Sequence, residues 1–161
     1  MRCDVLAVGT ELLLGQIVDT NSSWLGENLA MHGFDSLSQV KVGDNIGRIT
    51  GHLRRMLDEA DAVIMCGGLG PTHDDLTREA IADVMGVDLH LDEDVADVIR
   101  YLFTSRNRTM PENNLRQRWC LKGFHHPSDE GYCSGFDLSR HNRHSFWASR
   151  TGCVCRARRA A

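Results

Sequence analysis

The sequence predicts an α/β fold, a three-layer α/β/α sandwich around a mostly parallel sheet that is incomplete at its C-terminus. Short apolar runs that suit buried strands alternate with stretches of roughly 10 to 14 residues whose apolar positions recur with helical spacing. In addition, 16 of the 17 Val and Ile residues precede position 118. Such alternation favours right-handed crossovers, a parallel sheet and helices on both of its faces.

The individual elements follow from local patterns. Residues 3–9 are a short apolar run that ends in glycine, which suits a buried parallel strand, and residues 62–66 are the clearest run of this kind. Apolar residues three and four positions apart predict helices, and short polar side chains or glycine mark the helix ends. The expected series is strand 3–9, helix 21–32, strand 34–42, a helix from residue 46 to about residue 57, strand 62–66, helix 76–85, strand 87–91 and helix 92–104.

Charge and composition divide the chain after residue 117. Residues 1–117 carry 10 Lys and Arg against 19 Asp and Glu, a net charge of −9, whereas residues 118–161 carry 8 against 3, a net charge of +5. We therefore expect one domain over residues 1–117 and a tail over residues 118–161 with too few aliphatic side chains for a core. The overall charge of −4 argues against nucleic-acid binding. The N-terminus lacks an apolar run long enough for a signal peptide or membrane span, which predicts a cytoplasmic protein.

The strongest chemical signal is the segment CGGLGPTHDD between a predicted strand and a predicted helix. Gly67, Gly68 and Gly70 let backbone N–H groups approach an anion closely, and the following helix directs its positive end to the same place. Together with Thr72, these residues predict a site for phosphate. The competing interpretation is a tight turn that caps the helix, because Thr72 and Asp75 also match a capping pattern.

Two neighbouring side chains have open roles. His73, beside Asp74, could ligate a metal or act as a base, but a solvated loop histidine is the commoner case because a ligand usually needs an orienting partner. Arg78 could contact a phosphate or face the solvent.

The segment GGLGPTHDDLTREA resembles the signature of the CinA N-terminal domain, and GTELLLGQIVDTNSSWL, VGDN and RNRTMPENNLRQ agree with the same family in order and spacing. The resemblance covers residues 4–117. It implies the MoaB/Mog molybdopterin-binding fold, in which a glycine loop and an acidic residue hold a phosphorylated pterin. Related CinA-type domains are associated with metal-dependent hydrolysis of ADP-ribose, and the family also suggests a homo-oligomer.

By position, the resemblance implies that Asp75 and Asp44 are the two acidic residues of the site, with a catalytic role if the domain is an enzyme. Asn21 and Asp74 fall in the same matching blocks. From the residues alone, Asp44 is more often a turn residue than a catalytic one.

The resemblance also places Glu11 and Asp19 in the first matching block. If Glu11, Asp19 and Asp75 converge with Asp44 where the strands end, they could bind a divalent cation such as Mg²⁺ that neutralises a pyrophosphate and activates water. The structural alternatives are a helix cap for Asp19 and a solvated loop position for Glu11.

Two functions follow from these observations. The first is a domain that binds a phosphorylated ligand and hydrolyses ADP-ribose or a related nucleotide pyrophosphate with a divalent metal. The alternative is a non-catalytic module that holds a phosphorylated pterin or nucleotide, and an inactive truncated product is a third possibility. Sustained hydrolysis distinguishes the first from the others.

After Gln117 the chain departs from the family pattern and becomes rich in Arg, His, Cys and Ser. One back-translation of residues 123–136, read one nucleotide later, gives DFTILPTRVTAPG, which restores the element that the family has there. We therefore favour a reading-frame shift over a genuine basic appendage, and the nucleotide sequence around codon 118 tests this. In either case we expect residues 118–161 to be poorly packed.

Overall fold

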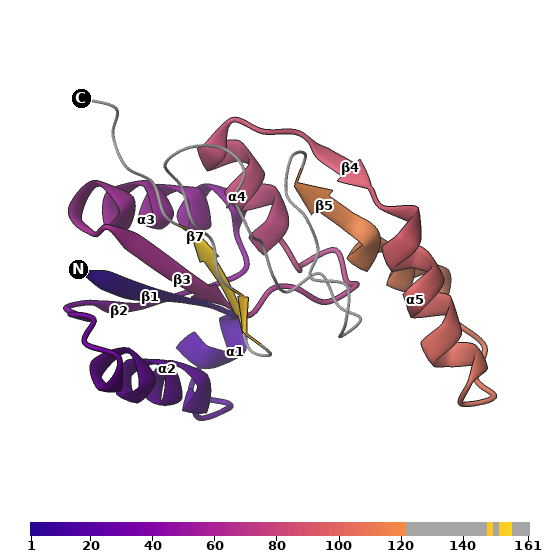
Figure 1. The fold of residues 1–161 in the computed structure, drawn as a ribbon, viewed down its shortest axis with the longest axis horizontal. Coiled ribbons are helices and arrows are strands. Elements are labelled where there is room, and N and C mark those ends of the chain that lie inside the picture. Colours follow the sequence, from indigo (N-terminus) through magenta and orange to yellow (C-terminus); the bar gives the residue numbers. More distant parts are fainter. Residues whose placement is uncertain (122–147, 150–151, 156–161) are drawn as a thin grey trace.

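The main sheet has three adjacent parallel strands at one of its sides. The computed structural model describes residues 1–121 and the backbone of residues 148–149 and 152–155. Strand β1 (Cys3–Val8) lies between β2 (Gln39–Val42) and β3 (Ala62–Cys66) and is parallel to both. The strand order is β2-β1-β3-β7-β6, with β7 (Gly152–Cys155) antiparallel to β3 and β6 (Ala148–Ser149) antiparallel to β7 (Figure 1). The predicted mostly parallel α/β fold is confirmed.

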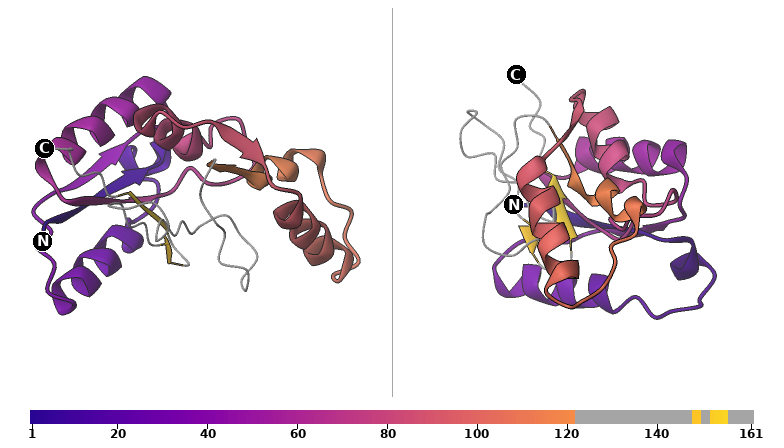
Figure 2. Two further views of the ribbon diagram at one scale, coloured as in Figure 1. Left: turned by 45° about the horizontal axis from the view of Figure 1, so that its top comes forward. Right: turned by 90° about the vertical axis from the view of Figure 1, so that its right-hand side faces the viewer.

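Helices cover both faces of this sheet. On one face, α3 (Ile46–Glu59) and α4 (Thr77–Met85) pack side by side, and on the other lies α2 (Thr20–Met31), as Figure 2 shows. Successive side chains along each strand point to opposite faces of the sheet, so each strand contributes to the core on both faces. The first core cluster includes Leu6, Val63 and Met65, and the second includes Val5 and Ile64. The short helix α1 (Thr10–Leu13) follows β1 directly.

A smaller unit extends the domain beyond α4. Strand β4 (Leu89–Leu91), helix α5 (Glu93–Thr104), the 3₁₀ helix η1 (Glu112–Arg118) and β5 (Trp119–Leu121) follow one another in the chain. The expected strand 87–91 therefore forms, but our placement of it in the parallel sheet was wrong. It pairs antiparallel with β5 in a separate two-stranded sheet, because β5 satisfies its backbone hydrogen bonds.

Strand β5 lies beyond Gln117, where we placed the start of the tail. Cys120 and Leu121 are buried, and Leu121 belongs to the main core cluster. The packed domain thus reaches at least residue 121. Farther along the predicted tail, β7 pairs with β3 and β6 pairs with β7, so these short segments of the tail extend the main sheet. The prediction that the rest of the tail is poorly packed falls on residues 122–147, 150–151 and 156–161, outside the described residues.

A buried carboxylate joins β1 to the segment that leads into β2. Asp4 is fully buried and accepts hydrogen bonds from the Arg2 guanidinium at 2.8 and 3.0 Å and from the amides of Leu37 and Ser38 at 3.0 and 3.1 Å. The same guanidinium also contacts Glu59, which is exposed, at 3.1 Å. Asp4 therefore connects two backbone segments, the start of the chain and residues 37–38, with its two oxygen atoms.

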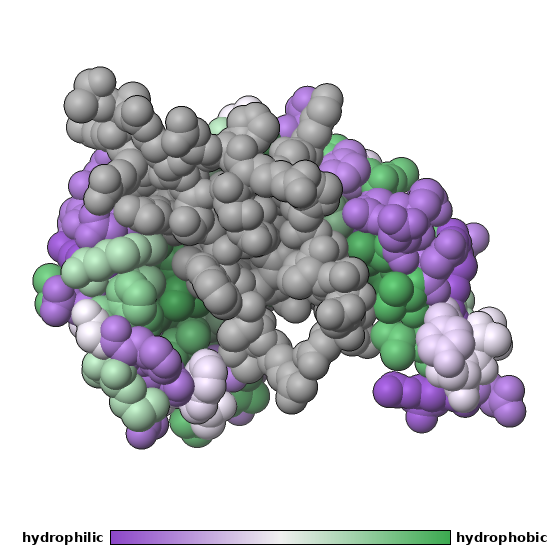
Figure 3. All heavy atoms as spheres, in the orientation of Figure 1, coloured by the Kyte–Doolittle hydropathy of each residue, from purple (hydrophilic) through white to green (hydrophobic). Residues whose placement is uncertain are grey.

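Several large apolar side chains stay on the surface. Figure 3 shows hydrophobic residues gathered at the lower left, in the region of α2, and again along the α5 unit. The segment after α1 contributes Leu14, Ile17 and Val18, which are 66%, 53% and 83% exposed. None of the helices in the described part of the chain is long and apolar enough to cross a membrane.

Candidate binding site at the carboxyl ends of the parallel strands

A pocket of about 140 Å³ opens where β1 and β3 end. Its polar lining comes from Glu11, Asp19, Thr20 and Asn21, that is, from α1 and the start of α2. The remaining lining is mostly apolar or backbone: Val8, Leu12, Ile17, Val18, Cys66 and Gly67. Apolar walls with a few polar groups are typical of sites for small molecules, and the carboxyl ends of parallel strands are their usual location.

The two oxygen atoms of Asp19 have different partners. Its Oδ1 accepts a hydrogen bond from the Ser22 amide at 2.9 Å and so caps α2, which confirms the helix-cap alternative. Its Oδ2 lies 3.5 Å from the Lys41 ammonium and has no direct hydrogen-bond partner among the described residues. Only 6% of the Asp19 side chain is exposed.

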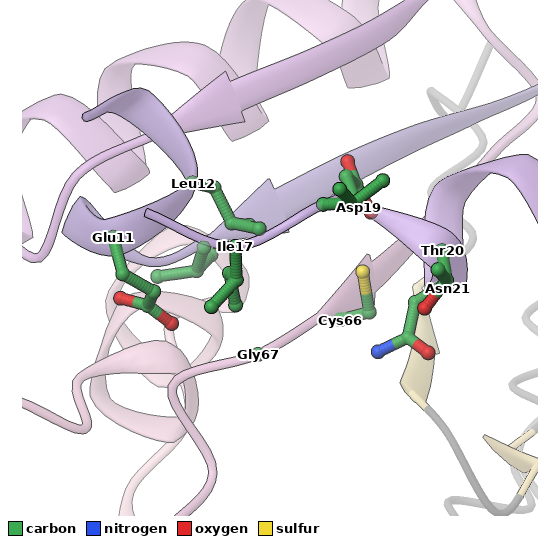
Figure 4. A pocket seen from close by; sticks show the side chains of 10 residues that line it. Glu11, Leu12, Ile17, Asp19, Thr20, Asn21, Cys66 and Gly67 are labelled. Carbon is green, nitrogen blue, oxygen red and sulfur yellow. The ribbon is translucent and has the colours of Figure 1, made fainter. Parts of the chain in front are cut away.

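The Cys66 thiol lines the pocket and is held in its neutral form. Burial raises the pKa of Cys66, the nearby charge of Asp19 raises it further, and the Ser22 hydroxyl offsets only part of this rise. In Figure 4 its sulfur points toward Asp19. At neutral pH Cys66 therefore contributes a small, neutral surface.

The loops after β1 and β2 hold each other through Thr10 and Asp44. The Thr10 amide donates to Asp44 Oδ2 at 2.8 Å, and the Asp44 amide donates to the Thr10 hydroxyl at 3.1 Å. Asp44 does not line the pocket. The structure thus gives it a positioning role between two strand ends, in agreement with the turn alternative.

The glycine loop passes unusually close to β1. Gly67 has a φ of +86°, and a Cβ atom built on it would lie 2.0 Å from the carbonyl oxygen of Val8. Gly68 has a φ of +61°. Glycine is therefore required at Gly67 by packing alone, whether or not an anion binds there.

The carboxylate of Asp75 occupies part of the same loop. Its Oδ2 accepts hydrogen bonds from the Thr72 amide at 2.8 Å and from the Thr72 hydroxyl at 2.6 Å, and the Gly70 amide also donates to the carboxylate. Helix α4 begins only at Thr77 and its N-cap residue, Leu76, forms no side-chain cap. The Thr72–Asp75 pair therefore closes a turn ahead of the helix, and two donors assigned to phosphate are already engaged by a carboxylate.

Two buried side chains hold the glycine loop from the interior of the domain. Arg78 is 2% exposed and donates to the carbonyl oxygens of Leu69 and Gly70 at 2.8 and 2.9 Å. The Thr77 hydroxyl donates to the carbonyl of Gly67 at 2.7 Å. The solvent-facing alternative for Arg78 was wrong, because its guanidinium donates to backbone acceptors inside the fold. A contact of Arg78 with phosphate stays a prediction.

The predicted carboxylates do not gather into one metal centre. Glu11 and Asp19 line the same pocket, but Figure 4 shows their side chains apart, with Leu12 and Ile17 between them. Asp75 and Asp44 are engaged elsewhere, in the contacts given above. In the part of the chain that the structure describes, no three His, Cys, Asp or Glu side chains are grouped as a metal would require.

Some residues of this region have no signature in the sequence. Lys41 reaches Asp19 from β2, and Arg116 reaches the glycine loop from η1, where its guanidinium lies 3.0 Å from His73 Nδ1. His73 and Asp74 are both exposed. Sequence reasoning left His73 without an orienting partner because Arg116 is distant in the chain.

Acid should lower the stability of the fold through Asp19 and Asp75. Burial raises the pKa values of Asp19 and Asp75, but hydrogen bonds from Ser22 and Thr72, together with the charges of Lys41 and Arg78, outweigh it and hold both pKa values below the ordinary 3.8. A lowered folded pKa stabilises the fold above the unfolded value, and this contribution is lost as pH falls through the folded value. We expect the melting temperature to fall below about pH 4, and Asp19→Asn to show a shallower fall. Circular dichroism melts between pH 7 and pH 2.5 measure this, and equal slopes would contradict it.

Comparisons with known proteins agree with this architecture. Residues 4–153 match the family described as a probable molybdopterin binding domain, a span that continues past Gln117. A CinA-like protein of Deinococcus radiodurans is 45% identical over 121 residues, which are 75% of this chain and 30% of that protein. The chain thus spans about a third of the length of the curated relatives that it matches.

Solved structures show the same relationship. The crystal structure of the protein CinA from Thermoplasma acidophilum is 31% identical with a TM-score of 0.70, over 78% of this chain and 73% of that one. The molybdopterin biosynthesis enzyme MoaB from Thermus thermophilus is 26% identical with a TM-score of 0.50, over 71% and 69%. On its sequence match, its CinA relatives and its fold, the chain belongs to the family of molybdopterin-binding-like domains found in CinA proteins.

Proposed function

We propose that this domain binds a phosphorylated pterin or a related phosphorylated heterocycle, with the ring in the pocket and the phosphate at the glycine loop. The observation that carries the proposal is the lining of the pocket, which joins an apolar wall to Gly67, the first residue of the loop. One ligand could therefore reach both parts. The family description and the likeness to MoaB support a pterin as the ring.

The chemistry of the pocket suits a flat ring with polar edges. Leu12, Ile17 and Val8 provide apolar contact, whereas Thr20 and Asn21 provide donors and acceptors near one edge. The buried Oδ2 of Asp19, which lies 3.5 Å from the Lys41 ammonium and accepts no hydrogen bond from a described residue, would be the acceptor for an N–H group of the ring. The ring of a pterin carries such N–H groups.

A matched pair of variants tests the pocket. Ile17 and Leu14 lie on the same exposed segment, but only Ile17 lines the pocket. We expect Ile17→Ser to weaken binding of dihydroneopterin triphosphate about tenfold, because apolar contact with the ring is lost, and Leu14→Ser to leave it within about twofold. Isothermal titration calorimetry measures both. An equal effect of the two variants would show that the ring does not bind in this pocket. If neither this pterin nor ADP-ribose releases or absorbs heat with the unaltered protein, the chain is an inactive truncated product.

Hydrolysis of ADP-ribose is the second candidate. It is favoured by one observation, that the carboxylates of Glu11 and Asp19 both line the pocket beside a loop proposed to hold phosphate. Glu11 and Asp19 lie apart in the pocket, so a divalent cation such as Mg²⁺ would be held by one of them together with oxygen atoms of the ligand and water. When bound, such a cation would neutralise the pyrophosphate and activate water.

The hydrolytic candidate makes a separate prediction. Release of AMP from ADP-ribose in the presence of Mg²⁺ or Mn²⁺ should be sustained and should be lost in Asp75→Ala, because Asp75 holds the turn of the glycine loop. Asp83→Ala, an exposed position on α4 paired with Arg54, is the control and should keep the activity. A folded protein that releases no AMP with any divalent metal would leave only the binding function.

A further inference from the structure

The side chain of Arg116 links three segments that are distant in the sequence. From η1, its Nη2 donates to Glu79 Oε1 of α4 at 2.8 Å, and its Nη1 lies 3.0 Å from Nδ1 of His73 in the glycine loop. Arg116 and Glu79 are 24% and 33% exposed, so this ion pair is partly shielded from water. The second oxygen of Glu79 is buried. Arg116 is therefore anchored on α4 and directed toward His73.

This contact determines the tautomer of His73. A guanidinium has only N–H donors, so Nδ1 of His73 must be the acceptor and carries no hydrogen. In the neutral ring the hydrogen then lies on Nε2, at the opposite edge of the imidazole. Because His73 is exposed, this N–H group is open to a ligand.

The backbone of His73 is fixed as well. Its neighbours Thr72 and Asp75 are joined by the hydrogen bonds that close the turn, and the Asp75 amide lies 3.3 Å from the carbonyl oxygen of Thr72. Gly70, three residues before His73, is held by Arg78. Both the backbone and the ring of His73 are thus set before any ligand arrives, which is the condition under which a single hydrogen bond adds to affinity.

We propose that Arg116 is a positioning residue for His73, and that His73 donates its Nε2–H to an anionic oxygen of the phosphorylated ligand at the glycine loop. The second half rests on the proposed function, whereas the first half concerns the protein alone. Arg116 acts through His73 and does not itself contact the ligand, since its two described contacts engage Glu79 and His73.

Nuclear magnetic resonance tests the positioning without any ligand. Long-range proton–nitrogen spectra of the full chain, with His73 assigned by comparison with His73→Gln, should show Nδ1 unprotonated and Nε2 protonated in the neutral ring. Arg116→Gln should give a mixture of tautomers. Arg118→Gln is the matched control, because Arg118 lies on the same 3₁₀ helix but pairs with Glu93 at 3.0 Å. An unchanged tautomer in Arg116→Gln would overturn the positioning.

Calorimetry with AMP and with inorganic pyrophosphate tests the ligand contact. We expect His73→Ala and Arg116→Gln each to weaken binding by about three- to tenfold, the effect of one hydrogen bond to a charged group. The double variant should be no weaker than His73→Ala, and Arg118→Gln should stay within about twofold of the original protein. Additive losses would show that Arg116 contacts the ligand itself and would overturn the proposal. If neither probe binds to the unaltered protein, the contact of His73 fails together with the proposed function, and the spectra alone decide the role of Arg116.

Discussion

Replacing Gly67 with alanine is expected to destabilise the domain by at least about 3 kcal/mol. The added Cβ would lie 2.0 Å from the Val8 carbonyl oxygen, and the backbone at Gly67 has a φ of +86°. The backbones of Val8 and Gly67 cannot easily move apart, because β1 and β3 are paired up to the preceding residues, Ala7 and Cys66. Urea unfolding followed by circular dichroism measures the loss.

Two other glycines separate the causes of this loss. Gly15 has a φ of +67° but open space around its Cβ position, so Gly15→Ala should show only the backbone cost, about 1 kcal/mol. Gly51 lies within α3 with ordinary φ and open space, so Gly51→Ala should be neutral or stabilising. A loss at Gly67 no larger than that at Gly15 would show that the close approach of the two strands is relieved easily.

The second large effect is expected for Asp4→Asn, with a loss of about 2–4 kcal/mol of unfolding free energy. An asparagine in this position has one acceptor oxygen where Asp4 now accepts four hydrogen bonds, and its NH₂ group would face other donors. No water can replace the lost contacts because Asp4 is fully buried.

Glu59→Gln is the control for Asp4. Glu59 contacts the same Arg2 guanidinium, but it is 66% exposed, so this variant should change stability by less than about 1 kcal/mol. Chemical denaturation at neutral pH compares the two variants. Similar losses would mean that the charge on Arg2, and not the burial of Asp4, determines the effect.

Much of the fold could be predicted because its signals are local. The apolar run of residues 62–66 coincides with β3, Asn45 caps α3 directly before Ile46, and Gly86 ends α4 with a φ of +65°. The strand expected over residues 34–42 is interrupted, since the continuous pairing with β1 covers only residues 39–42 and Asp35 forms an isolated bridge with Arg2, while Asp4 holds the amides of Leu37 and Ser38 between them. A side chain buried 33 residues away in the sequence leaves no trace in the local pattern.

The site was predictable in its location but not in its contacts. Glu11, Asp19 and Asn21, which the matching blocks grouped with Asp44 and Asp75, line one pocket, whereas Asp44 and Asp75 do not, and the roles of all five stay predictions. The matching blocks could not show that the Asp75 carboxylate accepts hydrogen bonds from Thr72 and Gly70, since this depends on where α4 begins. The role of Arg116 depends on the unit formed by β4, α5 and η1, whose position is set by tertiary packing.

The buried guanidinium of Arg78 bears on the rates expected for the proposed binding of a ligand at the glycine loop. Since Arg78 and Thr77 hold the carbonyl oxygens of the glycine loop in the folded chain, the loop does not need to become ordered when a ligand arrives. Ligands of similar charge should therefore associate at similar rates, with differences in affinity expressed in how long each remains bound. Variants that remove the hydrogen bonds of Arg78 or Thr77 to the loop would slow association of the ligand, whereas variants in the pocket would shorten its residence time.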